Sequence, residues 1–116
     1  MSRAEREKGA RGEREVAAVL RAHNLPAVRT SNSGGLHVRG DLTGVPGYHF
    51  EVKRQETLRI QQWVRQAWDD CPPDGTVPVV VFRTNRVPLD NPLGLWHAVI
   101  SLSELAKLLD LARLTA

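Results

Sequence analysis

The chain has 116 residues, which is enough for one domain with its own hydrophobic core, and we expect a single domain over residues 1–116. A single cysteine, Cys71, excludes a disulfide framework or a thiolate zinc site within one chain, and no apolar run reaches the 18 residues of a transmembrane helix. From the single cysteine and the absence of such a run we expect a soluble cytoplasmic protein without membrane contact. The formal net charge of +3 and the pI of about 9.6 are only mildly basic.

Residues 6–23 have helical periodicity, with an apolar stripe through Val16, Ala17 and Leu20. Glu13 lies three, four and seven residues before these positions, so it falls on the line of the inward face of the helix. A carboxylate at the edge of a core is costly unless it is paired, hydrogen-bonded or bound to a metal. The alternative is that Glu13 lies in the first turn of the helix, where the helix dipole favours it and water still reaches it.

The distribution of charge along the chain is more informative than its sum. Residues 1–30 contain seven Lys and Arg against four Asp and Glu, whereas residues 61–90 contain three against four. A basic N-terminal region suits a polyanionic substrate, although it also fits an ordinary solvated helix face.

A short strand is expected over residues 27–30, and the segment 31–40 that follows is rich in small residues. Glycines in such a loop allow the backbone to approach phosphates, but the same composition is typical of ordinary loops. Next, a Gly-x-Pro-Gly turn at residues 44–47 joins the short strand at Asp41 to the following strand as a hairpin. The hairpin is expected to bring Asp41 close to Glu51.

Residues 48–53 alternate between two kinds of side chain, as in a strand with one buried face. One face is apolar and the other is polar, the first with Tyr48, Phe50 and Val52 and the second with His49, Glu51 and Lys53. Two carboxylates, Asp41 and Glu51, beside the ammonium group of Lys53 suit a divalent-metal phosphodiesterase, because carboxylate oxygens hold Mg²⁺ or Mn²⁺. On its own, the pattern is more often that of a half-solvated strand.

The second half of the chain predicts a helix over residues 56–70, a strand covered on both faces over 77–83, a strand over 95–100 and a final helix. The helix over residues 56–70 has an apolar stripe of Ile60, Trp63, Val64, Ala67 and Trp68. Both tryptophans are expected in the core. Ser101 and Glu104 form a capping-box pattern that opens the final helix. The leucines of that helix exceed what one core contact needs, which indicates a partner surface, with the strand around Trp96 as a competing candidate.

Four blocks of the chain, taken in order, resemble the archaeal-type Holliday junction resolvases of the PD-(D/E)xK nuclease superfamily, which have relatives encoded by bacterial viruses. The blocks are Lys8-Gly9-x-x-x-Glu13-Arg14-Glu15, Ala27-Val28-Arg29-Thr30-Ser31, Gly40-Asp41 and Phe50-Glu51-Val52-Lys53. The resemblance implies a restriction-endonuclease-like α/β core, with a mixed central sheet of about five strands flanked by helices. Gly40 stands where the superfamily name has proline, a residue that shapes the backbone and supplies no ligand.

The resemblance also implies roles for individual residues. The catalytic positions match Glu13, Asp41, Glu51 and Lys53. The ligands of one or two Mg²⁺ ions, for which Mn²⁺ can substitute, match Asp41, Glu51, the main-chain carbonyl of Val52, and Glu13 directly or through water. The positions assigned to DNA binding are Arg14, Arg29, Ser31, Ser33 and Arg39.

The expected function is a metal-dependent, structure-selective DNA endonuclease that resolves four-way junctions by paired, symmetric nicks. A homodimer is expected, because two equivalent sites can nick two strands symmetrically. Such an enzyme fits DNA recombination and repair, or the processing of branched viral DNA in a host cytoplasm. Three alternatives stay open. They are a nuclease of the same superfamily acting on duplex, flap or mismatched DNA, a DNA-binding module on the same scaffold that does not cut, and a small structural protein whose charged residues are only solvated.

Overall fold

The computed structural model describes residues 2–30 and 40–116. Within these ranges the elements follow one another in the order α-β-β-β-α-β-β-α that the sequence predicts. They are α1 (Arg3–Ala22), β1 (Val28–Arg29), β2 (Leu42–Thr43), β3 (Tyr48–Arg54), α2 (Ile60–Asp70), β4 (Val77–Arg83), β5 (His97–Val99) and α3 (Leu102–Thr115). Helix α1 begins earlier than expected, because the Ser2 side chain caps it by accepting a hydrogen bond from the backbone N–H of Glu5.

The described strands form two sheets: β1 pairs with β2 in an antiparallel manner, and β3, β4 and β5 form a second sheet in that order. Strands β3 and β4 are parallel, with Glu51 beside Val80, and α2 is the crossover between them. Strand β5 pairs antiparallel to β4, so the larger sheet is mixed. The α/β class is confirmed, but the expectation of one central sheet of about five strands is wrong.

The carboxylate of Asp41 is the physical reason for this separation. The backbone N–H of Asp41 donates to the carbonyl of Phe50 at 2.8 Å, as in a strand pair. The next N–H along that edge of β3, from Val52, donates to Asp41 Oδ2 at 2.7 Å instead of to a strand carbonyl. A side chain therefore replaces the backbone ladder at this edge, and the two sheets stay distinct.

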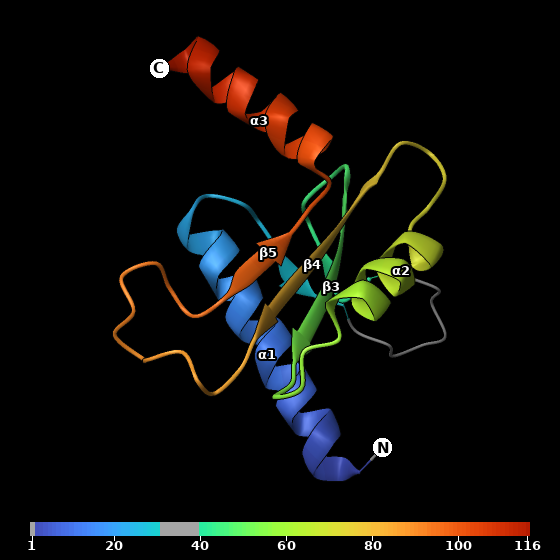
Figure 1. Cartoon of the computed structure of the whole chain (residues 1–116), viewed down its shortest axis with the longest axis vertical. Coiled ribbons are helices and arrows are strands. Elements are labelled where there is room, and N and C mark those ends of the chain that lie inside the picture. The colour runs from blue at the N-terminus through green and yellow to red at the C-terminus, as the bar shows by residue number, and fades with distance from the viewer. Residues whose placement is uncertain (1, 31–39) are drawn as a thin grey trace.

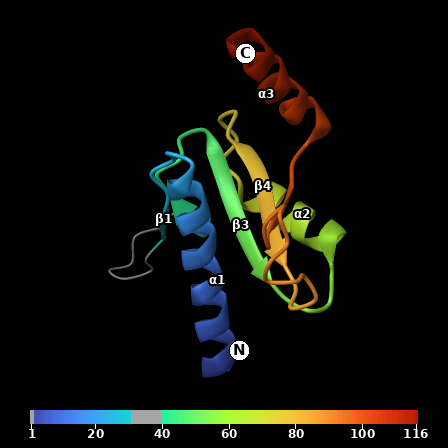
Figure 2. The same cartoon turned by 90° about the vertical axis from the view of Figure 1, so that its left-hand side faces the viewer.

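The larger sheet lies between two helices, with α1 on one face and α2 on the other (Figure 2). The core on the α1 side is built from Val16, Ala17, Ala27, Leu42, Phe50, Val79 and Val81. The core on the α2 side is built from Trp63, Ala67 and Val80. Strand β4 contributes to both cores, which confirms the prediction of a strand covered on both faces.

The second half of the chain differs from the expectations in several details. Helix α2 begins at Ile60 and not at residue 56, and β5 is shorter than the predicted strand at 95–100. Trp68 is 61% exposed, so its assignment to the core is wrong, whereas Trp63 is buried as predicted. The capping box does not form, because the Ser101 side chain makes no capping hydrogen bond and contacts Ser103 Oγ. Helix α3 has no buried residue and projects away from the sheet (Figure 1). None of the helices in the described ranges has the length and apolar character needed to cross a membrane.

Candidate active site at the edge of strand β3

Asp41 lies at the edge of β3, and its backbone is fixed from both sides. Its carbonyl accepts a hydrogen bond from the N–H of Thr30 at 2.9 Å, while its own N–H donates to Phe50. Its carboxylate accepts from the N–H of Val52. The hairpin expected from the turn at residues 44–47 is wrong, because β2 pairs with β1 and not with β3. Asp41 is instead held near Glu51 by its own hydrogen bonds to the β3 backbone at Phe50 and Val52.

Glu51 lies in the middle of β3 and is only 6% exposed. It is in register with Val80, so it points to the face of the sheet that α2 covers. Burial and then the neighbouring charge of Asp41 raise the pKa of Glu51 to about 7, with a further rise from the charge of Asp70 and from a hydrogen bond that the protonated group makes to Asp41. The charge of Lys53 opposes this rise. Near neutral pH the ionised form of Glu51 is therefore less stable in the protein than it is in water.

Glu13 lies on α1 and approaches Asp41 from the opposite face of the sheet to α2. Its Oε1 accepts a hydrogen bond from Arg29 Nε at 3.0 Å. Burial and then the charge of Asp41 raise the pKa of Glu13, while the hydrogen bond and charge of Arg29 and the charge of Arg14 lower it. Of the two interpretations of Glu13, the structure shows the inward-facing side chain that is paired with an arginine. The charge of Asp41 raises the pKa of both Glu13 and Glu51.

Lys53 points to the same face as Glu51, two residues farther along β3. Its Nζ donates a hydrogen bond to Gln66 Oε1 of α2 at 2.8 Å. Gln66 was not among the residues assigned to the site from the sequence. Its position gives a weak signal, because it lies three residues after the buried Trp63 and directly before the buried Ala67. A flanking polar residue of this kind is indistinguishable by pattern from a solvated one.

The main-chain carbonyl of Val52 is oriented toward the site edge. In an extended strand, the N–H and C=O of one residue point to the same side, and the N–H of Val52 faces Asp41. Its carbonyl therefore points away from β4 and toward the edge that Asp41 occupies. This is consistent with the expectation that Val52 contributes a backbone oxygen.

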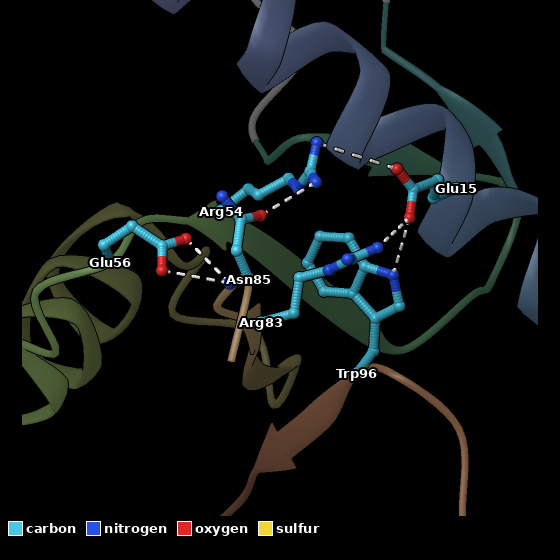
Figure 3. A network of polar contacts seen from close by, with 6 residues as sticks. All are labelled: Glu15, Arg54, Glu56, Arg83, Asn85 and Trp96. Carbon is cyan, nitrogen blue, oxygen red and sulfur yellow. Dashed lines mark hydrogen bonds and ion pairs between the residues drawn. The ribbon is translucent and has the colours of Figure 1, made fainter. Parts of the chain in front are cut away.

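A partly buried network centred on Glu15 connects α1 to the sheet (Figure 3). Glu15 Oε1 accepts hydrogen bonds from Arg83 Nη1 at 2.8 Å and from Trp96 Nε1 at 3.3 Å. Arg54 Nη1 lies 4.0 Å from the second oxygen of Glu15. A side chain at Gly12 would lie only 3.2 Å from the Trp96 ring and 3.3 Å from Arg54 Cβ, so glycine is needed for this close approach.

The remaining sequence-assigned residues concern DNA binding. Arg14 and Arg29 are both exposed residues, and Arg29 is already paired with Glu13. Ser31, Ser33 and Arg39 lie outside the described residues.

The donor atoms around Asp41 and Glu51 fit a hard divalent cation. Within residues 2–30 and 40–116, no three His, Cys, Asp or Glu side chains form a group that can hold a metal by itself. Two carboxylates with a backbone carbonyl and water are nevertheless the oxygen donors that Mg²⁺ takes, since it keeps several waters. The raised pKa of the buried Glu51 is the signature of negative charge that such a cation would stabilise.

Comparison with known families places this site in a context. Residues 4–107 match the family model described as "Phage putative PDDEXK endonuclease", a range that includes Glu13, Asp41, Glu51 and Lys53. The description of this family specifies no particular DNA structure. No curated protein and no solved structure matches the chain. Because the match covers most of the sequence and the whole candidate site, the chain belongs to this phage family of PD-(D/E)xK endonucleases.

Proposed function

We propose that the protein is a divalent-metal-dependent DNA endonuclease that nicks four-way junctions. The observation that carries the proposal is the buried Glu51 beside Asp41, with Lys53 on the same face of the same strand. Carboxylates with a raised pKa beside a second carboxylate and a lysine are typical of catalytic and metal sites. Membership in the endonuclease family supports the phosphodiester as the bond that is cut.

The metal would be held by Asp41, Glu51 and the carbonyl of Val52, with Glu13 assisting directly or through water. When bound, Mg²⁺ supplies Lewis-acid polarisation of the scissile phosphate and neutralises charge that develops on it. Asp41 is pre-positioned for this role, because hydrogen bonds from its own N–H and to its carboxylate fix it at the β3 edge. Little reorganisation is then needed when the cation binds.

Lys53 orients the attacking water and offsets the negative charge of the transition state. Its ammonium group is held by Gln66 at 2.8 Å, which keeps it on the Glu51 face of β3. The water oxygen bonds to phosphorus in line with the 3′ oxygen, the bond to that oxygen breaks, and the proton of water passes to solvent or to the leaving oxygen. Arg14 and Arg29 neutralise the flanking phosphates.

The preference for branched DNA rests on the sequence resemblance to junction resolvases and on the basic N-terminal region. The two alternatives that involve DNA are a nuclease that acts on duplex, flap or mismatched DNA, and a binding module that does not cut. A resolvase needs two sites related by a two-fold axis, so the proposal includes a homodimer.

We place the dimer contact on the apolar face of α3, with a second copy of this chain as its occupant. The exposed leucines Leu102, Leu105, Leu108 and Leu109 lie along one side of this helix. Helix α3 has no buried residue, so a second copy that packs along this leucine face would cover apolar surface that the single chain leaves exposed. The charged residues of the helix are paired within it, Lys107 with Glu104 and Arg113 with Asp110.

Nicking of a synthetic four-way junction tests the substrate proposal. Each strand is labelled in turn, and linear duplex, flap and mismatched DNA are run in parallel with Mg²⁺ or EDTA. We expect paired nicks at symmetric positions on opposite strands of the junction, and little cutting of linear duplex. Equal cutting of duplex would retain the metal site and contradict junction selectivity. Tight binding without cutting, over several metals, would leave only the binding module.

A further inference from the structure

We infer that His49 is a positioning residue for the Glu51 carboxylate, and that Gly40 leaves the space in which the imidazole ring does this. The inference rests on the proposed metal-dependent function and deepens it, because it assigns control of metal affinity to two residues outside the ligand set. The superfamily motif gives neither residue a role.

The contact between the two side chains is short and shielded from water. His49 Nε2 lies 3.0 Å from Glu51 Oε1, and the side chains are 2% and 8% exposed. The two residues are two positions apart on β3, so they share a face. With the ring proton on Nε2, His49 donates this hydrogen bond to the ionised carboxylate. A hydrogen bond to a charged acceptor in a site of low polarity is strong, because water does not compete for it. The carboxylate is consequently held in one orientation.

Gly40 explains how a ring fits at this position. Its φ is +84°, which proline cannot adopt and which residues with a side chain rarely adopt. A Cβ atom there would lie 3.2 Å from His49 Nδ1 and 3.3 Å from Cε1 of the same ring. The glycine directly before Asp41 therefore provides the room that the ring occupies. The departure from the proline of the superfamily name and the buried histidine are two parts of one arrangement.

A carboxylate that His49 holds in one orientation should bind a metal ion more tightly. A carboxylate that already points in one direction loses less conformational freedom when a cation binds. Partners that hydrogen-bond to metal ligands typically change metal affinity by 10- to 100-fold when they are removed. His49 is thus expected to affect the binding of the metal itself, and not only the stability of the fold.

The test compares two substitutions of similar length at position 49. His49→Gln keeps an N–H donor near the place of Nε2, whereas His49→Met has no donor. Binding of Mn²⁺ alone to the whole chain is measured by titration calorimetry, and thermal unfolding of the metal-free proteins is measured in parallel. We expect His49→Met to weaken Mn²⁺ binding by about 10- to 100-fold and His49→Gln to stay within about threefold of the wild type.

The outcomes separate this inference from the proposed function. Equal Mn²⁺ affinity of His49→Met and wild type would overturn the role of His49 and leave the metal site intact. Equal weakening in both variants would also overturn it, because the donor would then not matter. Failure of the wild type to bind Mn²⁺ any better than Asp41→Asn would overturn the proposed metal site and this inference with it. If His49→Met does not fold, His49→Asn, whose amide is too short to reach Glu51, replaces it with the same expected loss.

Discussion

At the residue scale, the proposed site depends on the free-energy cost of keeping the buried Glu51 carboxylate ionised. A carboxylate in a buried strand position is unfavourable unless a cation or a hydrogen-bond donor compensates it. His49 Nε2 is a donor to Glu51 when it carries the ring proton, and the positive charge of Lys53 acts on the carboxylate from the same face. The pKa of Glu51 still rises to about 7, so these compensations are incomplete. We interpret the remaining deficit as the cost of keeping a site ready for a divalent cation.

The first prediction concerns pH and stability without metal. Because the native-state pKa of Glu51 lies above its ordinary value of 4.5, the native state binds this proton more tightly than the unfolded state. The contribution of Glu51 to the free energy of unfolding is fully present below about pH 4.5 and is lost as the pH rises through about 7. Urea unfolding in EDTA should therefore show Glu51→Gln gaining on the order of 2 kcal/mol over wild type between pH 5 and 8.

Excess Mg²⁺ is the control for this prediction. It should raise the free energy of unfolding of the wild type at pH 8 and leave Glu51→Gln nearly unchanged, because the variant lacks the charged ligand. Parallel pH profiles of the two proteins in EDTA would show that Glu51 is not the strained group that the structure indicates.

At the element scale, each helix supplies one side of the site. Helix α1 brings Glu13 to Asp41, and helix α2 brings Gln66 to Lys53. The two helices lie on opposite faces of the sheet, so the site wraps around the edge of β3 (Figure 2). A shift of either helix would separate its residue from the strand residues, since positions at such sites must be held within about 1 Å.

Glu15 is predicted to be the main anchor of α1. Its carboxylate compensates Arg83, which is only 6% exposed, and in the described part of the chain the Nε atoms of Arg83 and Arg54 have no hydrogen-bond partner. Glu15→Ala would leave buried guanidinium charge without an acceptor and should lower the free energy of unfolding by about 2 to 4 kcal/mol. Glu7→Ala, which removes an exposed pair with Arg3, should cost at most about 0.5 kcal/mol. Denaturant unfolding measures both, and similar small effects would contradict the anchoring role.

Gln66 is predicted to matter for the rate and not for the fold. Gln66→Ala frees the Lys53 ammonium group, so the rate of DNA cleavage at saturating substrate should fall by about 10-fold. Gln61→Ala is the matched control, because Gln61 is an exposed glutamine on another side of α2. Both variants should melt within a few degrees of the wild type. A rate for Gln66→Ala equal to that of the Gln61 variant would remove Gln66 from the site.

At the scale of the whole molecule, α3 is the element that the single chain leaves uncovered. Its leucines are exposed, with Leu109 at 61% and Leu114 at 66%, although they lie on different sides of the helix. We predict that Leu109→Glu yields monomers, because it places charge in the proposed dimer contact, while Leu114→Glu leaves the dimer intact. Sedimentation velocity distinguishes the two states. A wild-type protein that is monomeric at micromolar concentration, or equal behaviour of the two variants, would contradict pairing through this face.

The sequence predicted the order of the elements and that Glu51 and Lys53 share one face of β3, because alternation in a strand directly encodes which side chains share a side. It also identified Glu13, since the helical spacing from Val16 points it inward. It did not reveal that the Asp41 carboxylate replaces a ladder hydrogen bond, because that depends on three-dimensional contacts of one side chain. Nor did periodicity show that Trp68 and the leucines of α3 lie exposed: it indicates an apolar face without indicating what covers it.

The most direct test of the account is the Mg²⁺ dependence of DNA cleavage by the wild type and by Asp41→Asn, prepared in parallel and shown by circular dichroism to be folded. Asp41 interacts electrostatically with both Glu13 and Glu51, and asparagine keeps the size of the aspartate side chain while removing its charge. The account predicts cleavage by the wild type with Mg²⁺, none in EDTA, and a rate at least about 100-fold lower for Asp41→Asn. Cleavage that persists in EDTA, or an Asp41→Asn rate equal to that of the wild type, would contradict it.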